Sequence, residues 1–242
     1  MKKKVLTVAL AVALIAILVS GSLAYFTAED EVTNTFTIGS VKIEIYENGE
    51  ATPDAVKPLG KLTPVVNGTP SDDESYIDKV VDVKNTGKND AYIRTHIAVP
   101  TALIGYLQLD VTADGWTYNG TITGSSTATV EGVAYTVFTY DYLTAVAPDG
   151  FTAELLQGVY LKSNVDLEED ASGNLEFILR DASGNKTANS GFVAHTKNTD
   201  GTYTSANVNI LVASEAIQTQ GFQNGATNAL NAGFGTNTNP WQ

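Results

Sequence analysis

Short stretches of the chain alternate between apolar and polar residues with a period of two. In the clearest of them, Val41, Ile43 and Ile45 share one side of an extended chain, which predicts a strand with one buried face. Further strands are expected where β-branched and aromatic residues gather between turn residues. They cover residues 76–83, 91–99, 132–142, 175–180 and 206–213. Because long stretches of helical period are rare, the pattern predicts a β protein.

Asn-Gly and Asp-Gly pairs mark the ends of these stretches, because both glycine and asparagine tolerate the positive φ that tight turns need. Such pairs occur at 48–49, 114–115, 119–120 and 200–201. The sequence Asp-Ala-Ser-Gly-Asn occurs twice, at 170–174 and 181–185, on either side of the strand over 175–180. This arrangement predicts two consecutive hairpins.

Short strands at regular spacing indicate an all-β fold, an antiparallel β-sandwich of jelly-roll type. Short C-terminal helical segments are expected over 215–220, where Ser214 can cap the helix, and over 226–232. A single β-sandwich domain then covers 41–232. Residues 233–242, rich in Gly, Thr and Asn, are expected to form a loose C-terminal tail.

The first 24 residues have the pattern of a cleaved signal peptide. Lysines at 2–4 precede an apolar run over 5–19, and small side chains at Ser22 and Ala24 suit a signal peptidase that cuts between Ala24 and Tyr25. The apolar run has about 15 residues, fewer than the ~20 that a transmembrane helix needs. We therefore expect cleavage rather than a retained anchor, with the membrane contacted only before cleavage.

Composition excludes several classes of function. The 242 residues carry a formal net charge of -13, so the chain lacks the cationic surface that nucleic acid binding requires. It contains no cysteine, which excludes disulfides, thiolate metal sites and a cysteine nucleophile.

The two histidines do not form a recognisable catalytic motif. His96 is expected in a strand and His195 in a loop or at a strand edge, and neither belongs to the His-Glu-x-x-His sequence that places two zinc ligands on one helix face. We therefore assign no catalytic, cofactor-binding or metal-binding residue, and expect no enzyme activity.

One acidic stretch raises the question of calcium. Asp166, Glu168, Glu169 and Asp170 precede 172–174 and offer the oxygen ligands that Ca²⁺ prefers. The spacing departs from a calcium-binding loop, and the repeated turn sequence is better explained by hairpins in which Asp accepts backbone hydrogen bonds. No cofactor is therefore expected, with a structural calcium site as the alternative.

Three parts of the sequence resemble the TasA/camelysin family of secreted proteins, which have a SipW-type signal peptide. The first is the end of the signal and its continuation, at 21–27 and 34–39. The second is the strand–turn–strand at 83–87 and 90–94. The third lies near the C-terminus, at 215–218, 221–222, 229–232 and 234–235. Residues 101–204 resemble no family that we can name.

The resemblance implies a jelly-roll subunit of extracellular fibres in a biofilm matrix or at the bacterial cell surface. Its partners would be copies of itself, with or without accessory matrix proteins, and a SipW-type signal peptidase during export. In such fibres the N-terminal segment of one subunit inserts as a strand into its neighbour. Here residues 25–40 form the candidate donor segment. Its apolar residues are Phe26, Val32, Phe36 and Ile38.

Alternatives remain open. The same N-terminal segment can be the first strand of its own sheet, or a disordered tail. The whole protein can instead be a cell-surface binding module or adhesin that uses loops or an exposed aromatic patch. Some camelysin-like members are classed as metallopeptidases, which is the least favoured alternative here because the zinc motif is missing.

Overall fold

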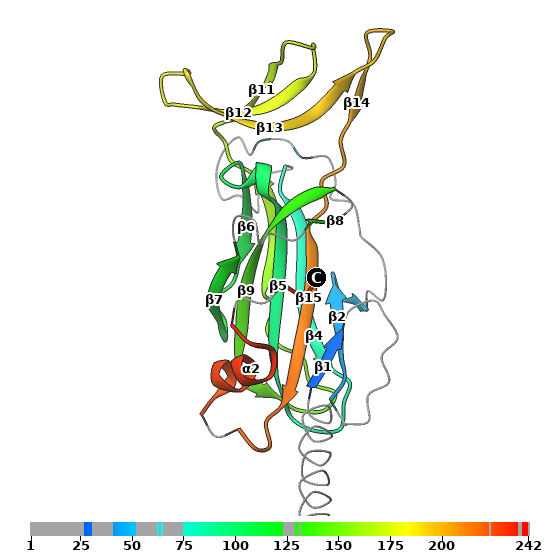
Figure 1. Ribbon diagram of the computed structural model, residues 1–242, viewed down its shortest axis with the longest axis vertical. Coiled ribbons are helices and arrows are strands. Elements are labelled where there is room, and N and C mark those ends of the chain that lie inside the picture. Colours follow the sequence, from blue (N-terminus) through cyan, green and yellow to red (C-terminus); the bar gives the residue numbers. More distant parts are fainter. Residues whose placement is uncertain are drawn as a thin grey trace, which may run out of the picture.

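The computed structural model describes residues 27–30, 41–51, 62, 64, 75–122, 129–130, 132–222, 224–236 and 239–241. Within them, two antiparallel sheets pack together, and the predicted β-sandwich is confirmed (Figure 1). The strands of the first sheet, in spatial order, are β1 (Thr27–Asp30), β15 (Leu211–Gln218), β5 (Ala91–Pro100), β9 (Val133–Val146) and β7 (Trp116–Ile122), with β8 (Thr129–Val130) paired to β9.

The second sheet lies against the inner face of the first. Its strands, in spatial order, are β3 (Glu50–Ala51), β2 (Ile43–Glu47), β4 (Ile77–Asn85), β10 (Leu156–Leu161) and β6 (Leu107–Val111). Several neighbours in each sheet come from distant parts of the chain: β15 lies beside β5, and β10 lies between β4 and β6.

The apolar side chains on the inward-facing side of alternating strands form the core between the two sheets. Ile93, Ile97 and Val99 on β5 face Val81 and Val83 on β4, and all five side chains are almost completely buried. Burial of apolar area is the main stabilising contribution in such a sandwich. The period-two pattern that predicted strands therefore also predicted which faces pack together.

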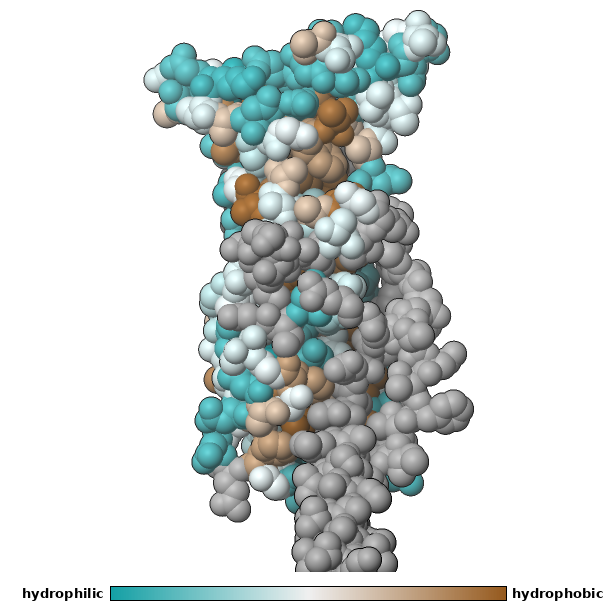
Figure 2. All heavy atoms as spheres, viewed as in Figure 1, coloured by the Kyte–Doolittle hydropathy of each residue, from teal (hydrophilic) through white to brown (hydrophobic). Residues whose placement is uncertain are grey.

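A third sheet caps one end of the sandwich (Figure 1). Its strands are β11 (Val165–Glu169), β12 (Leu175–Arg180), β13 (Lys186–Lys197) and β14 (Tyr203–Ser205). Phe177 and Ala194 join the main core from its inner side. Its outer side is mostly hydrophilic, with hydrophobic residues beneath (Figure 2).

The repeated Asp-Ala-Ser-Gly-Asn turns are the hairpins that the sequence predicts. Asp170 Oδ1 accepts hydrogen bonds from the backbone N–H groups of Ser172 and Asn174, each at 2.8 Å, and the turn at 181–185 repeats the arrangement. These hydrogen bonds, with that from the Asn174 side chain foremost, lower the pKa of Asp170 below its usual range. Gly173 adopts the positive φ of 84° that the turn requires.

Of the two expected C-terminal helices, one forms within the described residues. Residues 215–218, expected in a helix, belong to strand β15, because pairing with β1 and β5 outweighs their helical propensity. The other expected helix is present as α2 (Ala226–Phe234). It covers the outer face of the first sheet, where Leu230 of the helix packs in one cluster with Ile217 of β15. No helix in the described part of the chain is long and apolar enough to cross a membrane.

Residues placed in a loose C-terminal tail by the sequence analysis contact this same outer face. The Gly235 carbonyl accepts a hydrogen bond from Arg94, and Trp241 packs against Ala98, Tyr135 and Val137. Apolar contact with the sheet explains why a segment rich in polar and small residues is held there.

Candidate assembly site

Strand β1 lies on one edge of the sandwich and is formed by part of the candidate donor segment. Thr27–Asp30 pair antiparallel with β15, with Thr27 opposite Ile217 and Asp30 opposite Ser214. The predicted cleavage residues Ala24 and Tyr25, and the predicted donor residues Phe26, Val32, Phe36 and Ile38, lie outside the described residues. The described part of the segment thus pairs with its own chain.

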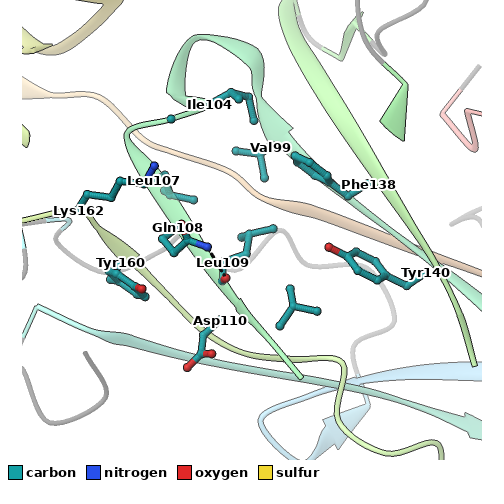
Figure 3. A pocket seen from close by; sticks show the side chains of 12 residues that line it. Val99, Ile104, Leu107, Gln108, Leu109, Asp110, Phe138, Tyr140, Tyr160 and Lys162 are labelled. Atoms are coloured by element: carbon teal, nitrogen blue, oxygen red, sulfur yellow. Dashed lines mark hydrogen bonds between the residues drawn. The ribbon is translucent and has the colours of Figure 1, made fainter. Parts of the chain in front are cut away.

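A groove opens on the opposite edge of the sandwich, between β6 and the inner face of β9 (Figure 3). Its volume is about 500 Å³. Phe138 and Tyr140 project from β9 toward Leu109 on β6, and Val99 lies deeper (Figure 3). Ile104, at one end, is 41% exposed. Aromatic and apolar side chains therefore line part of the groove, while most of its exposed surface is polar.

Strand β6 leaves one of its own edges open beside the groove. It ends the second sheet and pairs, among the described strands, with β10 alone. Its Gln108 side chain donates a 3.2 Å hydrogen bond to the Leu109 carbonyl. A strand edge that no described strand covers, next to a groove with aromatic and apolar side chains in its lining, is a geometry that accepts an added strand: main-chain groups pair, and alternate side chains enter the groove.

A tyrosine pair fixes the rim of the groove. The Tyr76 hydroxyl donates a 2.9 Å hydrogen bond to Asp110 on β6, and its ring stacks on Tyr160 of β10. The ring lies over Gly158, where an added Cβ would approach it to 2.1 Å. Burial, followed by the hydrogen bond to Asp110, raises the pKa of Tyr76 above the usual range of tyrosine.

This raised pKa predicts a pH dependence of stability. Because the fold favours the neutral hydroxyl, the stabilisation by Tyr76 is complete below about pH 10 and is lost as the pH rises above that value. We expect Tyr76→Phe to lose less stability than the unmodified chain between about pH 10 and 12. Thermal unfolding across this range measures the effect. Parallel pH profiles for the two chains would contradict it.

A cluster of buried polar side chains holds the C-terminal segment on the outer face of the first sheet through hydrogen bonds. Arg94 and Asp141, both fully buried, form a bidentate pair at 2.7 and 3.2 Å. Arg94 also donates to Asn231 Oδ1 of α2 at 2.6 Å and to the Gly235 carbonyl at 2.8 Å. Asn119 donates to Asp141 at 2.8 Å. This cluster joins segments for which the sequence analysis states the resemblance: Arg94 lies in 90–94, Asn231 in 229–232 and Gly235 in 234–235.

The two histidines lie in different sheets. His96 is buried on β5, with Nε2 3.4 Å from Glu215 Oε2, whereas His195 lies on β13 of the cap and contacts the Ser205 hydroxyl at 3.0 Å. Within the described ranges, no three His, Asp or Glu side chains are grouped so that they could hold a metal ion.

The acidic side chains that the sequence analysis considered as calcium ligands form ion pairs within the third sheet. Asp166 accepts a 2.6 Å hydrogen bond from Arg180, and the pKa of Asp166 is lowered chiefly by that contact. Glu168 pairs with Lys186, and Glu169 pairs with Lys197 at 3.3 Å. Cross-strand ion pairs therefore account for these side chains.

Sequence reasoning missed the groove and the Arg94 cluster. The sequence predicts no strand over β6 or β10, whose patterns are short, so the free edge could not be placed. A scan against protein-family models finds no match, and a search of curated proteins finds no significant relative. The family resemblance thus remains a prediction.

Proposed function

We propose that the protein is a secreted structural subunit of an extracellular filament or biofilm matrix. Each subunit donates its N-terminal segment, residues 25–38, to the groove beside β6 of the next. The observation that supports the proposal is this groove, lined by Leu109, Phe138 and Tyr140 among others, next to a strand edge that no described strand covers, on the side of the sandwich opposite β1. Removal of the signal between Ala24 and Tyr25 would release the segment.

The two surfaces belong to different edges of one subunit. A contact between unlike surfaces is head-to-tail, and it extends into a filament when its rotation does not close a ring. The first sheet places β15 and β5 between β1 and β9, so donor and acceptor in one subunit are well separated. Each added subunit therefore leaves a new groove free.

The donor sequence suits the groove. Phe26, Val32, Phe36 and Ile38 all occupy even positions, so an extended chain presents them on one side. That side would enter the groove between Leu109 and Tyr140, while the backbone pairs with β6. The odd positions 33, 35 and 37 are all threonine and would face outward.

Introducing a charge into the groove tests the proposal. We expect Leu109→Glu to abolish fibre formation by the chain beginning at Tyr25, because the carboxylate would be buried against the inserted strand. Leu143→Glu is the matched control, since Leu143 is 54% exposed on β9 and lies outside the groove. Negative-stain electron microscopy reads out fibres, and circular dichroism checks the fold.

The proposal is wrong if folded Leu109→Glu assembles like the control. A binding module or adhesin is the second candidate, favoured by Tyr118, which is 56% exposed and packs edge-on against Tyr140 of the groove. Monodisperse particles from the unmodified chain, with or without a blocked N-terminus, would favour this candidate.

A further inference from the structure

One lysine lies at an end of the groove beside β6. Lys162 directly follows β10, and its backbone N–H donates a 3.0 Å hydrogen bond to the Tyr106 carbonyl, just before β6 begins. Its side chain lines the groove and extends toward the Leu107 end of β6 (Figure 3). Within the described part of the chain, no carboxylate pairs with its ammonium group. This end of the groove therefore carries positive charge.

The other end of β6 carries negative charge. Asp110 lies three residues beyond Leu107, about 10 Å further along at the rise of a strand. Its carboxylate lines the groove and accepts the hydrogen bond from Tyr76, and no cation among the described residues pairs with it. The groove is therefore positive toward Leu107 and negative toward Asp110.

Both charged side chains lie on the outer face of the second sheet. Leu109 packs against the core, so its neighbour Asp110 points to the opposite face. In Figure 3, Lys162 and Asp110 lie on one side of β6, whereas Leu109 and Phe138 lie on the other. A strand added beside β6 would therefore meet these charges with its outward-facing side chains.

The candidate donor segment carries its acidic residues at one end of that outward face. When its apolar even positions turn into the groove, its odd positions turn outward. These odd positions are Glu29 and Glu31, followed by threonine at 33, 35 and 37. The negative charges of the outward face therefore precede its uncharged positions.

We propose that Lys162 fixes the direction of insertion: the donor segment runs parallel to β6, with Glu29 and Glu31 beside Lys162. The inference rests on the proposed function and adds the direction and charge contacts of the inserted strand. In this direction the threonines pass Asp110, whose carboxylate accepts hydrogen bonds from hydroxyl groups. The opposite direction would bring both glutamates beside Asp110, and like charges at neighbouring positions weaken strand pairing.

The geometry allows the contact between Lys162 and the glutamates. An added strand lies one spacing beyond β6, so about 10 Å separates its backbone from that of Lys162. Lys162 already reaches the groove, and both lysine and glutamate have long side chains. The same direction brings Asp30, the one charged residue among the even positions, to the Lys162 end of the groove.

Charge reversal tests the role of Lys162. In the chain beginning at Tyr25, we expect Lys162→Glu to slow fibre growth about tenfold at low ionic strength, because attraction becomes repulsion. Adding Glu29→Lys and Glu31→Lys should restore growth, which a merely structural role of Lys162 would not explain. Light scattering follows growth, and circular dichroism checks the fold.

Lys88→Glu is the matched control. Lys88 is exposed in the turn between β4 and β5, outside the groove, and its substitution changes the net charge equally. This chain should grow fibres at the unmodified rate. Equal growth of the Lys162→Glu and Lys88→Glu chains, or failure of the glutamate reversals to restore growth, would overturn the inference.

A donor segment of unchanged composition distinguishes the two directions. Glu29→Thr and Glu31→Thr, combined with Thr35→Glu and Thr37→Glu, keep the net charge and move the acidic residues to the other end. We expect slow growth, because the acidic residues then meet Asp110. Growth at or above the unmodified rate would show that insertion is not parallel.

The Leu109→Glu chain keeps the two proposals apart. If it forms no fibres while Lys162→Glu grows normally, the groove remains the acceptor and only the direction is wrong. If Leu109→Glu assembles normally, or the unmodified chain forms no fibres, the filament proposal itself is wrong and the direction falls with it.

Discussion

A chain with Ala28→Cys and Ala216→Cys should form fibres only after reduction. The two positions are opposite in the antiparallel pairing of β1 with β15. Opposite residues in such a ladder have Cα atoms about 4.5–5.5 Å apart, within the range that a disulfide bridges. Because the natural chain has no cysteine, the engineered bond has no competitor.

The expected effect is close to all-or-none. The disulfide holds β1 on its own subunit, so residues 27–30 cannot be donated, and reduction restores them. Fibre formation followed by light scattering and electron microscopy, before and after a thiol reductant, measures the effect. The chain with Thr196→Cys and Thr204→Cys provides a control disulfide between β13 and β14 of the cap. That chain should assemble in both states.

Assembly of the oxidised Ala28/Ala216 chain at the unmodified rate would reject strand donation through β1. The segment would then be an ordinary first strand of its own sheet, which is one of the alternatives that the sequence leaves open.

Arg94→Met should cause a large loss of stability. The substitution leaves Asp141 buried without its guanidinium partner and removes the hydrogen bonds to Asn231 and Gly235. Breaking a buried ion pair from one side costs about 3–5 kcal/mol. Asn119, which still donates to Asp141, should keep the loss within this range.

Urea unfolding of the Arg94→Met chain measures this loss. Arg180→Met is the matched control, because Arg180 forms an exposed pair with Asp166 and should cost about 1 kcal/mol or less. Adding Asp141→Leu to Arg94→Met should recover part of the stability, since it removes the uncompensated charge. Equal losses for Arg94→Met and Arg180→Met would show that the buried cluster contributes little.

Patterns over a few neighbouring residues predicted the strands and turns that depend on short-range interactions. The alternation at Val41, Ile43 and Ile45 became β2 and the residues just before it, and the stretch over 175–180 became β12 with the same bounds. The twin hairpin turns followed from the hydrogen-bonding reach of Asp170 and Asp181. Side-chain period and turn chemistry act over a few residues, so a single chain reveals them.

Pairing between segments far apart in the sequence determined the features that the sequence analysis missed. Residues 215–218 became a strand because β1 and β5 lie on both sides of them. Arg94 meets Asn231 and Gly235 across more than a hundred residues of sequence, and Trp241 finds an apolar site formed by β5 and β9. These contacts have no local signature, since the partners are brought together only by the order of strands in the sheet.

The sequence by itself therefore determined an antiparallel β-sandwich, its turns and an acidic, cysteine-free chain with a signal-like start. Only the tertiary structure decided that β6 keeps an edge that no described strand covers, that Phe138 and Tyr140 line the groove beside it, and that β1 lies on the opposite side. The physical reason is that hydrophobic alternation fixes which face of a strand is buried. It does not fix which strand becomes its neighbour, and the free edges of a sheet depend on that choice.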